Sequence, residues 1–147
     1  MVEVARSRRT PPEPSSLRGA TFVSMILAAG SFWVALVTLF PETFLAGSYL
    51  VDESQSTIVR SLIQVLPLWP ILFGIAAVAM AVCTIRKRFV AYAHSYAAGI
   101  WGTFGSVFIL QSALYEPPRS VLTGGLALVA ALVHIGMVLI WGDQGVK

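Results

Sequence analysis

Two histidines, His94 and His134, are the residues of this chain whose type and spacing best suit chemistry. Each lies in a long apolar stretch, a few residues from the end that we expect to face the same side of a membrane. At ~1.5 Å per helical residue, both lie roughly 8–10 Å below that surface. Two imidazoles at equal depth on neighbouring helices could bind one haem iron or metal ion, or relay a proton. They could also be structural, each hydrogen-bonded to a neighbouring helix.

Other signs of chemistry are absent from the sequence. No HExxH, GxSxG, phosphate-binding loop or dinucleotide-binding motif occurs. The single cysteine, Cys83, excludes an intramolecular disulfide and a CxxC metal site. We therefore predict no enzyme, no catalytic residue and no dedicated metal site, with haem b at the two histidines as the one cofactor alternative.

Four long apolar stretches must position these residues. They cover residues 17–40, 61–85, 89–114 and 120–141. Each exceeds the ~20 residues that cross a bilayer core as a helix. Hydrophobic residues make up 56% of the 147-residue chain and charged residues 12%, so too little polar sequence remains to cover four soluble helices. The expected fold is an all-α membrane protein with four transmembrane helices.

Basic residues predict the orientation of these helices. Eight lie on one side of the predicted membrane, and that side should be cytoplasmic: Arg6, Arg8, Arg9, Arg18, Arg86, Lys87, Arg88 and Lys147. Only Arg60 and Arg119 lie on the other side. The sequence thus predicts an up-down-up-down bundle in the cytoplasmic membrane with both termini inside. Because the basic residues lie at membrane edges, the bilayer is the expected partner and nucleic acid is not.

The domain organisation follows from the same pattern. Residues 1–16 are polar, basic and proline-rich, and we predict a disordered tail. Residues 17–141 form the predicted transmembrane domain. Residues 142–147 are a short cytoplasmic tail, preceded by Trp141, which we expect to be an interfacial anchor.

The third stretch carries a stripe of small residues at helical spacing. The residues fall on one helix face: Ser95, Gly99, Gly102, Ser106 and Ala113. Small side chains let helices approach closely in lipid, so the stripe is a candidate packing seam. It could receive another helix of the same chain or a second copy of the protein.

The second stretch contains Pro67 and Pro70, and both prolines lack the N–H that an interior helix position needs. We expect a kink there, which could be static or a hinge.

A resemblance extends over most of the chain. It rests on Phe40-Pro41, a loop with Ser48-Tyr49-Leu50, the Pro67–Pro70 segment, the basic turn at residues 86–88, and a last stretch containing His134. This order of features resembles small four-span, holin-like membrane proteins of phages that infect actinobacteria. The resemblance implies a protein that self-associates in the host cytoplasmic membrane and permeabilises it. It assigns no site residue.

Two other functions stay open at the level of sequence. The histidine pair is compatible with a small haem- or quinone-associated subunit of a respiratory membrane complex. The small-residue seam is compatible with an accessory scaffold that binds another membrane protein.

Overall fold

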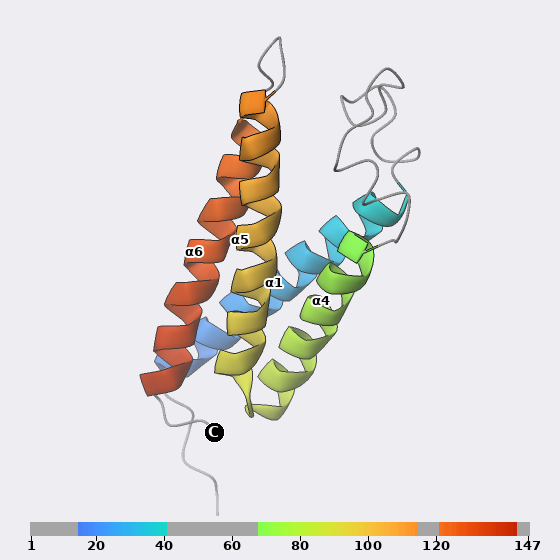
Figure 1. The fold of residues 1–147 in the computed structure, drawn as a ribbon. Coiled ribbons are helices and arrows are strands. Elements are labelled where there is room, and N and C mark those ends of the chain that lie inside the picture. Colours follow the sequence, from blue (N-terminus) through green and yellow to red (C-terminus); the bar gives the residue numbers. More distant parts are fainter. Residues whose placement is uncertain (1–14, 41–67, 115–120, 144–147) are drawn as a thin grey trace, which may run out of the picture.

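The computed structural model describes residues 15–40, 68–114 and 121–143, all of them helical apart from short helix ends and one turn (Figure 1). The helices are α1 (Ser15–Leu39), α4 (Leu68–Arg86), α5 (Val90–Leu114) and α6 (Leu122–Asp143). The predicted all-α class is confirmed. Most of the predicted tail at residues 1–16 and the predicted outer loops lie outside the described residues, but Ser15 and Ser16 belong to the first turn of α1.

Three of the four helices are long and apolar enough to cross a membrane: α1 from Ser16, α4 and α6. This supports the predicted membrane location and the presence of transmembrane helices. Apolar side chains cover these helices on nearly all sides, as expected where lipid replaces water. The remaining helix, α5, is 25 residues long and is not one of the three candidates found among the described residues. The four-span topology with both termini inside stays a prediction.

The helices associate as two antiparallel pairs, α1 with α4 and α5 with α6, which we call the two hairpins (Figure 1). The tightest packing is between α5 and α6, followed by α1 against α4, whereas α4 touches α5 less and α1 barely touches α6 (Figure 1). Joining the two hairpins therefore depends on a small number of contacts.

The basic turn at residues 86–88 is as tight as the sequence predicts. The Lys87 N–H donates to the Thr84 carbonyl (3.3 Å) and the Arg88 N–H to the Cys83 carbonyl (3.1 Å), the bond pattern of a Schellman helix end. Lys87 has a φ of 52° and Phe89 a φ of 61°, the left-handed region that side chains disfavour. These bonds end α4 and turn the chain directly into α5.

The small-residue seam that packs inside the protein lies on α1, where the sequence interpretation placed none. Its members occupy one face at helical spacing and are all buried: Ala20, Ser24, Ala28, Ser31 and Ala35. Aromatic rings of α4 and α5 lie in the same core cluster as part of this seam. Phe73 packs edge-on against Trp101 and Phe104, with centroid distances of 4.9 and 5.3 Å.

A pair of glycines sets the close approach of α5 and α6. A Cβ at Gly105 would lie 2.9 Å from the Gly124 carbonyl oxygen. A Cβ at Gly124 would lie 2.6 Å from Cγ1 of Ile109 and 2.8 Å from the Gly105 carbonyl oxygen. No side chain larger than hydrogen fits at either position while the helices keep this spacing.

The predicted seam on α5, unlike the seam on α1, lies mostly on the outside of the bundle. Ser95, Gly99, Ser106 and Ala113 are exposed on the outside of the bundle. Gly102 is half-buried, and a Cβ there would be 3.9 Å from Ala131 of α6. In the described part of the chain, no other helix packs against this stripe except beside Gly102. Its role in association between copies stays a prediction.

The prolines of the predicted kink lie at the edge of the described region. Pro70 is buried in the first turn of α4, where a helix needs no N–H from that residue. Pro67 lies outside the described residues, and the kink stays a prediction.

Candidate functional site: a buried histidine pair

The two histidines singled out from the sequence touch each other. Nδ1 of His94 on α5 and Nδ1 of His134 on α6 are 2.9 Å apart, and both side chains are fully buried. Their ring centroids are 5.2 Å apart. The two histidines therefore lie at the same level of the bundle on neighbouring helices, and their depth in a membrane stays a prediction.

A serine of α1 extends this pair to the other hairpin. Oγ of Ser24 lies 2.9 Å from Nε2 of His94, and the indole N–H of Trp141 donates to the same oxygen at 3.1 Å. Ser24 and Trp141 are both fully buried. The site is thus a linear chain of hydrogen bonds, Trp141–Ser24–His94–His134, which joins α1, α5 and α6.

Two protonation patterns satisfy this chain. In the first, the Ser24 hydroxyl donates to Nε2 of His94, and the Nδ1–H of His94 donates to Nδ1 of His134. In the second, the Nδ1–H of His134 donates to His94, whose Nε2–H donates to Ser24. The two rings always have opposite roles at Nδ1, because a shared hydrogen bond needs one donor and one acceptor.

Nε2 of His134 is the open end of the chain. It is buried and makes no hydrogen bond within the described part of the protein. In the first pattern this nitrogen carries a proton, and in the second it offers a lone pair. Conversion of the second pattern to the first takes up one proton at Nε2 of His134 and releases one at Oγ of Ser24. The arrangement is therefore chemically able to relay a proton.

The same geometry bears on haem or metal binding. Two nitrogens on opposite sides of one ion, each with a bond of ~2.0 Å, would lie about 4 Å apart. The Nδ1 atoms are 2.9 Å apart and face each other, so the rings would have to separate to admit an iron between them. Nor do the described residues contain a group of three or more His, Cys, Asp or Glu suited to a metal ion.

Further polar bonds to α1 accompany the histidine chain. The indole N–H of Trp101 on α5 donates to Oγ of Ser31 at 3.2 Å. Nζ of Lys87 in the basic turn lies 3.4 Å from Oγ1 of Thr21. Ser24 and Ser31 are seven residues apart on one face of α1, so each meets an indole from the opposite hairpin. The polar bonds of α1 thus supplement the sparse packing between the hairpins.

The sequence analysis did not identify Ser24 or Ser31 as residues of the site, and it expected Trp141 at the membrane surface. The predicted interfacial anchor is wrong for Trp141, because its ring is 0% exposed and its N–H is bonded inside the bundle. The spacing of small residues from Ala20 to Ala35 was the signal that could have identified the buried face of α1.

Comparison with protein-family models, with curated proteins and with solved structures finds no match to this chain. Functional inference therefore depends on the residues and their geometry.

Proposed function

We propose that this protein is an integral membrane protein that self-associates through α5 and permeabilises the membrane, in the manner of a holin. The observation that carries the proposal is a gap in the apolar surface of α5. Between Tyr96 and Leu110, every large apolar side chain of α5 is buried or half-buried. At ~1.5 Å per residue this gap is roughly 20 Å long, a large part of a bilayer core of ~30 Å.

Small residues occupy this gap. Gly99, Thr103 and Ser106 are its exposed members, and we call them the small face of α5. The hydroxyl of Thr103 donates to the Gly99 carbonyl at 2.9 Å within the same helix. The face is therefore smooth, and this hydroxyl needs no partner from another molecule. Such a surface suits close backbone approach of a second helix.

The other three helices differ from α5 in this respect. They expose large apolar side chains along their lengths, among them Phe22, Ile26, Phe32, Ile75, Val78, Leu126, Leu132 and Leu139. Surfaces of that kind suit lipid chains. The contrast favours α5 as the helix that meets a second copy of the protein.

Expression in a bacterium tests the proposal. Induced wild-type protein should collapse the membrane potential, followed with a voltage-sensitive dye. The double variant Gly99→Leu/Ser106→Leu covers the small face with large side chains and should abolish the collapse. Gly30→Leu is the matched control, because Gly30 is exposed on α1 and a Cβ there meets no atom within 4 Å.

The outcomes separate the parts of the proposal, provided that equal membrane levels of each protein are verified by immunoblot. A normal potential with abundant wild-type protein would contradict permeabilisation. Collapse by wild type and by both variants alike would contradict the role of the small face. The absorption spectrum of the purified protein addresses the respiratory alternative, since bound haem b would give a Soret band.

A further inference from the structure

Positive charge is concentrated at one end of the bundle. Arg86, Lys87 and Arg88 follow one another in the turn between α4 and α5. The bond of Lys87 to Thr21 places the start of α1, with Arg18 one turn away, at this same end. Among the described residues the only carboxylate is Asp143, at the end of α6. This end therefore carries an excess of cations over anions.

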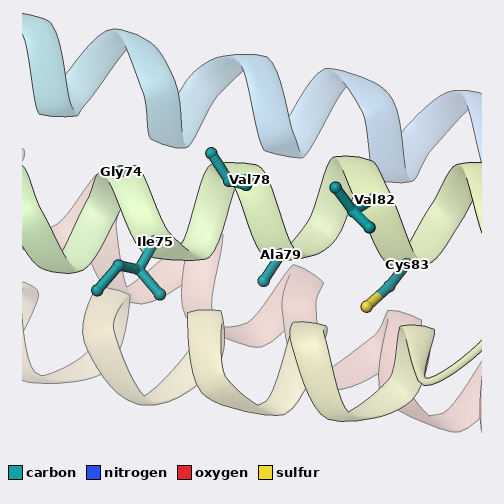
Figure 2. A pocket seen from close by; sticks show the side chains of 6 residues that line it. All are labelled: Gly74, Ile75, Val78, Ala79, Val82 and Cys83. Atoms are coloured by element: carbon teal, nitrogen blue, oxygen red, sulfur yellow. The ribbon is translucent and has the colours of Figure 1, made fainter.

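An apolar groove of about 450 Å³ runs along α4 toward this charged end (Figure 2). Its lining consists of Gly74, Ile75, Val78, Ala79, Val82 and Cys83. Gly74 contributes no side chain, and a Cβ there would meet no atom within 4 Å. The groove is thus open and apolar, and it lies on the surface of a candidate membrane span.

The groove and the charges lie on one line. Val82 and Cys83 precede Arg86 by four and three residues, and residues at these spacings are neighbours on one helix face. Arg86 is exposed one turn beyond the groove. From Gly74 to Cys83 the helix rises roughly 13 Å, which is close to one leaflet, half of a ~30 Å bilayer core.

We propose that this surface is a binding site for an anionic phospholipid. One acyl chain lies in the groove of α4, and the headgroup phosphate is held at the turn by Arg86 and Arg88. Arg86 lies nearest the groove, and the Arg88 guanidinium stacks 4.8 Å above the Phe89 ring, which limits its motion. Cationic residues at the membrane surface attract anionic lipids, and a zwitterionic headgroup lacks the net charge that these residues complement. This inference does not depend on self-association through α5.

Lipid titration of the purified full-length protein in an uncharged detergent tests the site, with thermal unfolding as the measurement. The probes are phosphatidylglycerol, phosphatidylcholine with the same chains, and glycerol phosphate without chains. Phosphatidylglycerol should raise the melting temperature at a concentration at least tenfold below that of phosphatidylcholine. Glycerol phosphate should have no effect at matched concentration.

Two variants assign the effect to the groove and the charges. Arg86→Gln/Arg88→Gln should weaken phosphatidylglycerol binding roughly thirtyfold, from the loss of two charges, and remove the preference over phosphatidylcholine. Gly74→Leu adds a large side chain at the groove, where its Cβ would meet no atom within 4 Å, and should weaken the binding of both lipids. Its control is Gly136→Leu on α6, where a Cβ also meets no atom within 4 Å.

Each of three results would contradict the proposed lipid site. Equal binding of the two lipids by wild type would leave no role for the charges. Binding of glycerol phosphate as tight as that of the lipid would indicate a phosphate site without a chain. Unchanged phosphatidylglycerol binding by Gly74→Leu would exclude the groove.

Discussion

At the scale of single residues, Ser24 links α1 to two buried side chains of the opposite hairpin. Its one oxygen is bonded to both Trp141 and His94, and all three side chains are fully buried. Buried polar groups that lose their partner cost more than an average hydrogen bond contributes. Loss of the Ser24 oxygen would leave an indole N–H and an imidazole nitrogen without that partner.

Ser24→Ala should therefore lower the free energy of unfolding by about 2–4 kcal/mol, from two unpaired buried groups at ~1–2 kcal/mol each. Ser95→Ala is the matched control, because that hydroxyl is exposed and donates to the Ala91 carbonyl of its own helix. Unfolding in mixed micelles, followed by circular dichroism, measures both. Equal stability of the two variants would show that the Ser24 bonds contribute little.

The histidine pair predicts coupling between two substitutions. His94→Phe and His134→Phe should each destabilise the protein, since each leaves a buried imidazole without its 2.9 Å partner. The double variant should lower the free energy of unfolding by about 0.5–3 kcal/mol less than the sum of the two single effects. A double-mutant cycle measures this difference, and strict additivity would contradict a direct bond between the rings.

At the scale of helices, hydropathy predicts which segments exist but not which faces meet. The stretches 17–40 and 89–114 correspond closely to α1 and α5, because a continuous apolar run of this length has few alternatives to a helix. The inward face of each helix was harder to predict. A helix that is apolar on all sides gives no periodic signal for the side that packs against protein.

This limit explains which parts of the site the sequence revealed. His94 and His134 stood out because imidazoles are rare in an apolar stretch, and their matched depth followed from helix rise alone. Ser24 did not stand out, since its partnership depends on the rotation of α1 against α5 and α6. The small residues of α5 suggested a seam, whereas the buried seam belongs to α1.

The glycine contact between α5 and α6 yields a prediction at this scale. Gly124→Ala should destabilise the protein by about 1–3 kcal/mol, because the added methyl would overlap Ile109 and the Gly105 carbonyl. Its neighbour offers a matched control, since a Cβ at Gly125 meets no atom within 4 Å. Gly125→Ala should be neutral or stabilise by up to ~1 kcal/mol through helix propensity.

Thermal unfolding of the two variants in the same detergent distinguishes these effects. A Gly124→Ala protein as stable as Gly125→Ala would show that α5 and α6 are not held at the described spacing.

At the scale of the whole molecule, the two hairpins and the uneven surface suggest a division of roles. Polar bonds from α1 to α5, α6 and the basic turn join the hairpins within one copy. The small face of α5 remains outside this interior. We infer that the first set of contacts holds a single copy together and that the second surface brings copies into contact.

Disulfide cross-linking in native membranes tests this association most directly. In a Cys83→Ala background, Ser106→Cys places a thiol on the small face, and Gly30→Cys places one on the exposed side of α1 at a similar number of residues from the helix start. Oxidation should convert Ser106→Cys largely to a covalent dimer and leave Gly30→Cys monomeric. Equal cross-linking of the two variants, or none in either, would contradict self-association through α5.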